Sequence, residues 1–318
     1  MAQEKKFGRL TVEHPLVEEL ASGRHPWWSR LVDISRTDRD INIQVRGTYL
    51  NVYCKMGNLL KIYMQGKKVA CDVHYKYLVG THTPEYITVL PTGSDIALKR
   101  SCDMVTSILD DKNFRVVKQN ISNYAGEEKR IQSRLVEKNK ATILDVEIAF
   151  SDSEVLADSE DGSTRIDIAN LDKNRHCIVF VELKQIFDSR LYSSEMNDQI
   201  RKYVRFAKKH EQYLLEAYRN VLKVKLALEV ISEGDYLASA VIERVEHKPI
   251  LAIAGYNQAL IDGMKDRIVK GSPPLETSNL AGLYFFGIDA DLNLKKGTNK
   301  EVFEASGSLL VDAVPVGA

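Results

Sequence analysis

The sequence has few cysteines, no long apolar run and no excess of charge of either sign. Its four cysteines, Cys54, Cys71, Cys102 and Cys177, are scattered, without a CxxC pair or a histidine-rich companion. This spacing speaks against zinc and disulfide frameworks and favours a reducing compartment. No window approaches the about 18 apolar residues of a membrane span, and the N-terminal residues lack the apolar core of a signal peptide. We therefore expect a cytoplasmic protein without a membrane partner.

Charge and length set the next limits. Lysine plus arginine and aspartate plus glutamate each number 44 among 318 residues. A neutral chain has no overall field that attracts a polyanion, so contact with nucleic acid must come from local patches. The length allows two domains, and the 44% apolar content can build a core for each. There is also no helicase motif, GxxxxGK[ST] loop or evident helix-turn-helix.

The first part of the chain has the pattern of an antiparallel sheet. Between residues 40 and 79 strand-like runs alternate with glycine-containing turns at Met56-Gly57-Asn58 and Gln65-Gly66-Lys67. A helix is predicted at residues 94–111, with Ser94 as its N-cap. We therefore expect a β-rich N-terminal domain.

The rest of the chain alternates helices with strands. This order indicates an α/β domain with a mixed sheet flanked by helices. The helices are predicted at residues 126–139, 194 to about 230, and 257–270. The strands are predicted at residues 142–150, 164–172, 176–184, 249–256 and 282–289, before a loose tail at 311–318. The two predicted domains are residues 1–118 and 119–318.

One apolar strand ends in charged residues. The run Ile178-Val179-Phe180-Val181 is apolar on both faces, yet Glu182 and Lys184 follow it and share one face. A charge at the end of a buried strand is unfavourable unless something compensates it. Asp167 lies on the preceding predicted strand, so pairing of the two strands would place it beside Glu182. Two neighbouring carboxylates repel each other unless a cation joins them.

A hard divalent cation with oxygen ligands fits this arrangement. We expect Asp167, Glu182 and the Leu183 carbonyl to bind Mg²⁺, with Mn²⁺ as a substitute. Such a cation acidifies water into a nucleophile, and Lys184 would orient that water or stabilise charge on a phosphate. The alternative is a structural salt bridge at a strand end. An acidic residue two before a lysine also occurs at Glu4/Lys6, Asp110/Lys112, Glu127/Lys129 and Glu246/Lys248, so only the position of this copy gives it weight.

Over about residues 120–260 the combination resembles the PD-(D/E)XK nuclease superfamily. Its pattern is an aspartate on one strand, an acidic-x-lysine on the next, and a glutamate on a preceding helix. The stretch "QIRKY", Gln199 to Tyr203, is similar to the glutamine-xxx-tyrosine signature of RecB-type members, and its two ends share a helix face. The resemblance implies a restriction-endonuclease-like fold and Mg²⁺-dependent DNA cleavage that leaves 5′-phosphates. The catalytic residues it implies are Asp167, Glu182, Lys184, Gln199, Tyr203 and the helix glutamate.

The helix glutamate has several candidates. Glu128 precedes Ile131 by three residues and Leu135 by seven, so it shares their inward face and is our choice. The alternatives are Glu127 and Glu137 on the same helix, and Asp145 and Glu147 on the strand that follows.

The long helix after the lysine strand is locally basic. Arg201, Arg205, Lys208 and Lys209 recur at helical spacing beside Gln199, which predicts phosphate contacts on that face. The alternative is a solvated face balanced by Glu195, Asp198 and Glu211. Nothing here reads bases, so RNA stays open as a substrate beside DNA.

These observations predict a divalent-metal-dependent deoxyribonuclease. The N-terminal domain would sense, dock or regulate, through a protein partner or a second copy, as in an effector of bacterial defence against phage. A repair or recombination nuclease and a catalytically silent nucleic-acid-binding regulator are the alternatives. Trp27 and Trp28 are either a docking patch or buried anchors.

Overall fold

The computed structural model describes residues 9–79, 86–91, 93, 96, 108–150 and 164–287. Its chain contacts form two compact units. Of the described residues, unit 1 contains those within 134–219 and 237–287, and unit 2 contains those within 9–133 and 220–236. Most of the helix predicted at residues 94–111 and the tail predicted at 311–318 lie outside the described residues.

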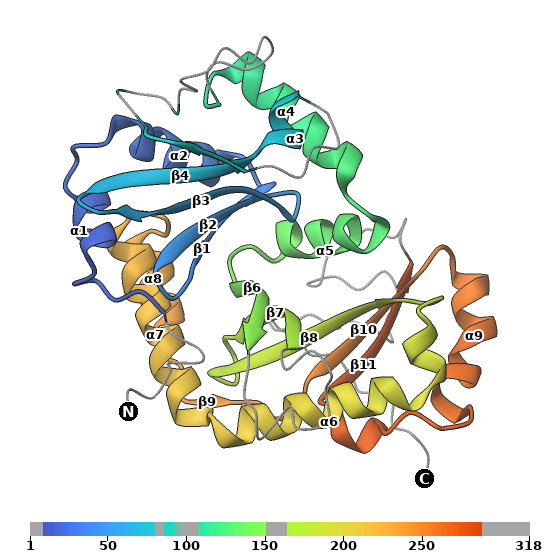
Figure 1. Ribbon diagram of the computed structural model, residues 1–318. Helices are drawn as coiled ribbons and strands as arrows, with labels where there is room; N and C mark the ends of the chain where they lie inside the picture. Colours follow the sequence, from blue (N-terminus) through green and yellow to red (C-terminus); the bar gives the residue numbers. More distant parts are fainter. Residues whose placement is uncertain are drawn as a thin grey trace. The chain divides into compact units, whose positions relative to one another are not determined.

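Unit 2 is built on an antiparallel meander (Figure 1). Its strands pair in chain order. They are β1 (Ile41–Val45), β2 (Tyr49–Cys54), β3 (Gly57–Gln65), β4 (Lys68–His74) and β5 (Tyr86–Val89). The predicted meander is thus confirmed, and β5 extends it. The first turn lies one residue earlier than predicted, because Lys55 and Met56 adopt positive φ angles of 46° and 62° and Gly57 already belongs to β3.

The described segments before, between and after these strands form four helices of unit 2. They are α1 (Pro15–Ala21), α2 (Pro26–Thr37), α3 (Tyr75–Val79) and α4 (Asp111–Tyr124). Helix α2 packs against β1, while α1 and α4 pack against β3. Trp27 and Trp28 of α2 are buried, so they are core anchors and not a docking patch.

The units do not coincide with the predicted ranges 1–118 and 119–318. Residue 118 lies inside α4, whose Lys118 forms ion pairs with Asp38 and Asp40 of the same unit. The later helix α7 (Glu211–Ala227) also contributes to unit 2, since the Lys225 Nζ donates to Gln44 Oε1 at 3.0 Å. Packing therefore returns a distant segment of chain to the first sheet.

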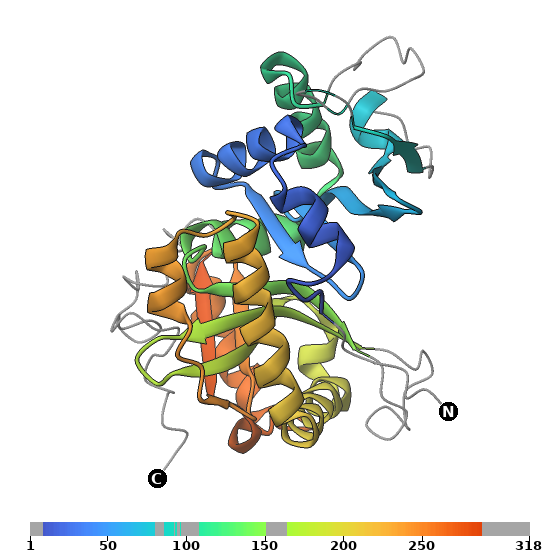
Figure 2. The same cartoon turned by 90° about the vertical axis from the view of Figure 1, so that its left-hand side faces the viewer.

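Unit 1 is built on a mixed sheet in the order β11-β10-β8-β7-β6 (Figures 1 and 2). Strands β6, β7 and β8 pair antiparallel, and β8, β10 and β11 pair parallel. The short strand β9 pairs with the start of β8. Their bounds are β6 (Ile143–Phe150), β7 (Thr164–Asp172), β8 (Cys177–Gln185), β9 (Arg244–Val245), β10 (Ile250–Gly255) and β11 (Gly282–Gly287). The predicted α/β class with a mixed sheet is confirmed.

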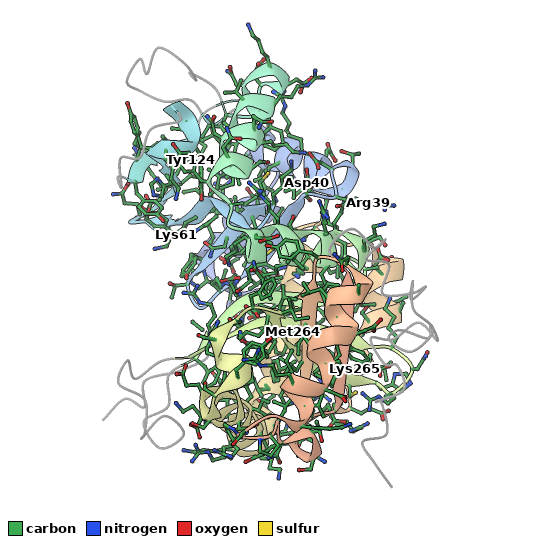
Figure 3. All side chains as sticks on the ribbon, turned by 90° about the vertical axis from the view of Figure 1, so that its right-hand side faces the viewer. Arg39, Asp40, Lys61, Tyr124, Met264 and Lys265 are labelled. Atoms are coloured by element: carbon green, nitrogen blue, oxygen red, sulfur yellow. The ribbon has the colours of Figure 1, made fainter. Side chains whose placement is uncertain are left out.

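Two helices cover the face of this sheet that carries Glu182 and Lys184. In register, Leu251 and Ile253 of β10 lie beside these two charged residues and share their face. They join a buried cluster with side chains of α6 (Ser194–Lys209) and α9 (Gln258–Lys270), the helix that bears Met264 and Lys265 in Figure 3. The apolar cluster therefore fixes α6 over the charged end of β8.

The helix predicted from 194 to about 230 is two helices, so the single-helix prediction is wrong. Helix α6 ends at Lys209, and His210 leaves the helical conformation with φ −114° and ψ 16°. Helix α7 then starts at Glu211, whose carboxylate accepts the Val245 N–H at 3.1 Å and contacts His247 Nε2 at 2.8 Å. These contacts anchor the new start to the β9 segment.

Four further elements lie among the described residues. They are α5 (Glu127–Lys138), α8 (Glu233–Ser239), and the 3₁₀ turns η1 (Ser189–Tyr192) and η2 (Thr277–Asn279). In the part of the chain that the structure describes, each helix is too short or too polar for a membrane span.

Candidate active site

The hairpin of β7 and β8 brings two acidic residues together. Its loop is closed by the pair Asp172–Cys177, and the pairing runs to Ile168–Val181. Asp167 and Glu182 are the next residue on each strand. The Leu183 N–H donates to Asp167 Oδ2 at 2.7 Å, so the carboxylate lies on the end of β8. The predicted strand pairing and the proximity of Asp167 to Glu182 are confirmed.

Lys184 closes a local ion pair at the same strand end. Its ammonium group contacts Glu182 Oε1 and donates to the Leu183 carbonyl oxygen at 3.1 Å. Glu182 and Lys184 are each only 2% exposed. This pair therefore stands in a dry environment, where electrostatic interactions are strong.

Helix α6 holds the other side of Glu182. Gln199 Nε2 donates to Glu182 Oε1 at 2.7 Å, and the Tyr203 hydroxyl lies 2.7 Å from Glu182 Oε2. The same hydroxyl lies 2.6 Å from the carbonyl oxygen of Arg165. The i, i+4 spacing places Gln199 and Tyr203 on one face of α6, as predicted, and the structure aims that face at Glu182.

The electrostatics of the two acids are unfavourable for their charged forms. Burial raises the pKa of Asp167 well above its usual value, and the charge of Glu182 raises it further. Burial also raises the pKa of Glu182, although Lys184, Tyr203 and Gln199 act in the opposite direction. Perturbed carboxyl groups of this kind are typical of functional sites.

The donors at this strand end suit a hard divalent cation. The two carboxylates and the Leu183 carbonyl are oxygen ligands, and a cation would relieve the repulsion between Asp167 and Glu182. The Lys184 ammonium already contacts Glu182 and the Leu183 carbonyl oxygen. The oxygen atoms of these two groups therefore already interact with a cation. Within the described ranges no three His, Cys, Asp or Glu side chains form a metal-binding group. Mg²⁺ or Mn²⁺ would thus be held by these donors together with water.

The glutamate predicted on the helix belongs to unit 2. Glu128 lies in the first turn of α5, in the portion that belongs to unit 2, so its role stays a prediction. Of the strand alternatives, Asp145 is buried and its Oδ1 accepts the Val146 N–H at 2.8 Å. Glu147 instead opposes the ionisation of Asp167, so its charge acts on the site.

Arg165 is a site residue that sequence reasoning missed. It lies two residues before Asp167 on β7, and its Nη1 donates to Glu147 Oε2 at 3.1 Å. The alternation of side chains along β7, which places residues 165 and 167 on one face, was the available signal.

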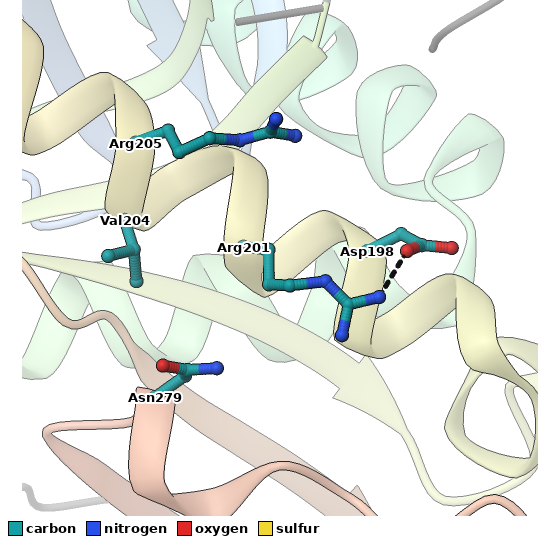
Figure 4. A pocket seen from close by; sticks show the side chains of 5 residues that line it. All are labelled: Asp198, Arg201, Val204, Arg205 and Asn279. Atoms are coloured by element: carbon teal, nitrogen blue, oxygen red, sulfur yellow. Dashed lines mark hydrogen bonds and ion pairs between the residues drawn. The ribbon is translucent and has the colours of Figure 1, made fainter.

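The basic residues of α6 lie elsewhere than expected. With 100° of rotation per residue, Arg201 and Arg205 stand roughly 200° and 240° around the helix from Gln199. They line a pocket of about 480 Å³ (Figure 4). Asp198, Val204 and Asn279 complete its lining. This position differs from the predicted basic face beside Gln199.

Ion pairs change what these basic residues offer. Arg201 binds Asp198 at 2.5 Å and also Glu276, and these hydrogen bonds raise its pKa. Arg205 and Lys208 are exposed and show no ion pair within the described part of the chain, and Lys209 is exposed as well. Arg205 is therefore the stronger candidate for a phosphate contact at this pocket.

The site can polarise, orient and protonate, which are the requirements of hydrolysis. It combines the buried Glu182 and the half-buried Asp167, both with raised pKa values, with a lysine, and with an amide and a phenol that fix the Glu182 carboxylate. A fold alone does not define such an activity, so the site geometry carries the inference. Comparison with protein-family models, curated proteins and solved structures finds no match to this chain.

Proposed function

We propose that the chain is a divalent-cation-dependent nuclease that hydrolyses DNA phosphodiester bonds, with a restriction-endonuclease-like unit 1 of the RecB type. The observation that supports this most is the meeting of Asp167, Glu182 and Lys184 at the end of one hairpin. Gln199 and Tyr203, the two residues of the predicted signature, both contact Glu182. Mg²⁺ is the proposed cofactor, with Mn²⁺ as a substitute.

Each residue has a distinct task in this proposal. Gln199 and Tyr203 each contact one oxygen of Glu182, so the carboxylate keeps one orientation. The Lys184 ammonium supplies a donor for the negative charge that develops on a phosphate during attack. A divalent cation held by Asp167, Glu182 and the Leu183 carbonyl would polarise a phosphoryl oxygen and lower the pKa of the attacking water. Burial of Glu182, Lys184 and Tyr203 strengthens the interactions among them.

Cleavage assays test the proposal directly. Wild-type protein and Lys184→Ala are incubated with linear, nicked and single-stranded DNA, and with RNA, in Mg²⁺, Mn²⁺ or a chelator. We expect cleavage only with a divalent cation, and a loss of at least about 100-fold in Lys184→Ala. Lys118→Ala in unit 2, which loses a lysine paired with two aspartates, is the matched control and should cut normally. Equal activity of wild type and Lys184→Ala would reject the assignment.

A second function is supported by the same ion pair. Glu182 is already contacted by Lys184, Gln199 and Tyr203, which is also how a catalytically silent scaffold would satisfy a buried carboxylate. In that case the chain would bind nucleic acid as a regulator. Tight DNA binding that is independent of divalent cations, with no cleavage of any substrate, distinguishes it from the nuclease.

The biological role is a separate part of the proposal. Unit 2 is a compact body of its own, which suits a part that senses a signal or binds a protein partner or second copy. We propose that it regulates the nuclease in defence against phage. Cells that express the wild-type protein should resist phage infection, and cells that express Lys184→Ala should not. Sensitivity to DNA damage without any effect on phage would favour a repair nuclease instead.

A further inference from the structure

Strand β6 places a third acidic residue in line with the two site carboxylates. In the pairing of β6 with β7, Val146 lies opposite Ile168, and Ile148 lies opposite Ile166. Glu147 therefore occupies the position opposite Asp167. Asp167 and Glu182 each lie one residue beyond Ile168–Val181, where the pairing of β7 with β8 ends. Carboxylates directly opposite each other on adjacent strands are destabilising. In this row of three acids, Lys184 pairs with Glu182 and Arg165 pairs with Glu147.

The backbone at Glu147 is distorted at this point of the strand. Its φ angle is 53°, in the left-handed region that residues other than glycine rarely adopt. Such a conformation is strained and is concentrated at functional sites. The side chain that it carries is only 8% exposed. The backbone of β6 therefore departs from regular strand conformation at Glu147.

Arg165 is the residue that holds this third acid in the described conformation. Its Nη1 lies 3.1 Å from Glu147 Oε2, and 64% of the Arg165 side chain is exposed. Its carbonyl oxygen lies 2.6 Å from the hydroxyl of Tyr203, the residue that also contacts Glu182. The arginine is thus anchored to the site through its backbone, while its guanidinium group is open to a ligand in solvent.

Arg165 and Glu147 match the two components that a nuclease must bind, a phosphate and a divalent cation. A guanidinium group forms paired hydrogen bonds with a phosphate as well as with a carboxylate, so a phosphate can replace the carboxylate that it binds. A carboxylate released by that exchange becomes an additional oxygen ligand next to Asp167. With Glu147 turned to Arg165, the three acids form no metal-binding group among the described residues, as observed.

We propose that Glu147 and Arg165 complete the active site. Arg165 contacts a phosphate of the nucleic acid, and Glu147 joins Asp167 and Glu182 around the divalent cation. This inference rests on the proposed nuclease function and adds to it a third acidic ligand and a substrate contact. No bond forms or breaks in the exchange, since only ion-pair partners change.

Mn²⁺ binding to the full chain tests the acidic ligand without any need for cleavage. The paramagnetic signal of free Mn²⁺ is titrated with wild type, Glu182→Gln, Glu147→Gln and Glu147→Asp, each checked for unchanged circular dichroism. We expect Glu182→Gln and Glu147→Gln each to weaken Mn²⁺ binding about 10-fold or more, with partial recovery in Glu147→Asp. Glu246→Gln is the matched control, because Glu246 is also a partly buried carboxylate paired with arginine, on the β9 side of the sheet.

DNA binding tests the arginine. Affinity is measured by fluorescence anisotropy at several salt concentrations in Ca²⁺, for wild type, Arg165→Ala and the control Arg244→Ala, whose arginine pairs with Glu246. Arg165→Ala should weaken binding and reduce the salt slope by about 1, as expected for one lost phosphate contact, while Arg244→Ala should not.

The outcomes separate this inference from the proposed function. Loss of Mn²⁺ binding in Glu182→Gln but not in Glu147→Gln overturns the third ligand and leaves the nuclease standing. An unchanged salt slope in Arg165→Ala overturns the substrate contact. Mn²⁺ binding that depends on Glu147, without cleavage of any nucleic acid, supports the ligand and rejects the nuclease. A wild type that binds no Mn²⁺ rejects both.

Discussion

Each unit of the chain contains a lysine beside two carboxylates, and the two clusters are built differently. In unit 2 the Lys118 ammonium lies 2.6 Å from Asp38 and 2.7 Å from Asp40, which Figure 3 labels, and the three side chains are 21–25% exposed. In unit 1 Lys184 pairs with Glu182, both are almost fully buried, and Asp167 accepts a backbone N–H. Lys118 thus lies at nearly equal distances from its two aspartates, whereas Lys184 forms its ion pair with Glu182.

The electrostatic consequences of this difference are opposite. Partial burial disfavours the charged form of Lys118, but its hydrogen bonds to Asp38 and Asp40 outweigh this and raise its pKa. In unit 1 burial raises the pKa values of Asp167 and Glu182 despite the nearby lysine. The cluster in unit 2 thus favours the charged form of its lysine, whereas the cluster in unit 1 disfavours the charged forms of its two acids. Such raised pKa values are characteristic of a binding or catalytic site.

The largest contrast is expected when each lysine loses its charge. Lys184→Met leaves the buried Glu182 carboxylate without its ion-pair partner, which should lower the free energy of unfolding by about 3–5 kcal/mol. Lys118→Met removes a lysine from a cluster that is partly open to solvent, and should lower the free energy of unfolding by only about 1 kcal/mol. Urea unfolding measured in chelator would show the difference. Equal losses for the two variants would mean that the clusters are energetically alike.

The next contrast concerns the hydroxyl that bridges the site. Tyr203→Phe removes a group that contacts both Glu182 and the Arg165 carbonyl, and should lower the free energy of unfolding by about 1–3 kcal/mol. Catalysis should fall by about 10-fold, because Glu182 loses one of its orienting contacts. Thermal unfolding and initial cleavage rates measure the two effects. Tyr63→Phe in unit 2, which loses a hydrogen bond to Asp72, is the control and should cut normally.

The next contrast concerns Asp167, and it is tested by measuring the unfolding temperature at a series of pH values. Because the pKa of Asp167 is raised in the folded protein, its contribution to stability is full below the unfolded value and is lost as pH rises through the folded value. Asp167→Asn is neutral at every pH and keeps an oxygen acceptor for the Leu183 N–H. In chelator it should unfold at about the same temperature as wild type near pH 4 and about 2–8 °C higher at pH 8. A difference in unfolding temperature between Asp167→Asn and wild type that does not change with pH would contradict this.

The smallest contrast is expected between Arg201 and Arg205 on the surface, where Arg201 forms a third cluster of one cation and two acids. Arg201 pairs with Asp198 and Glu276, whereas Arg205 beside it in the same pocket is exposed. Arg205→Ala should reduce the salt slope of DNA binding by about 1. Arg201→Ala should change it less, because its charge is already balanced by the two acids. The reverse order would show that DNA displaces the acids from Arg201.

Much of the chain could be predicted from local pattern. Strand β7 has the predicted bounds, 164–172, and α5 and β8 differ from theirs by a residue or less at each end. The break at His210 was missed because helical periodicity continues on both sides of it, and the contacts that set it come from the β9 segment. The unit boundary was missed for a similar reason, since α4 and part of α7 pack with a sheet formed far earlier in the chain.

The sequence by itself determined which side chains share a face: Glu182 with Lys184 on a strand, and Gln199 with Tyr203 on a helix. Those relations follow from the repeat of the backbone, two residues in a strand and 3.6 in a helix. Only the tertiary structure decided that α6 lies over Glu182 and that Glu147 stands opposite Asp167. Contacts between elements depend on strand register and on the apolar packing that holds a helix in place, and these are properties of the whole folded unit.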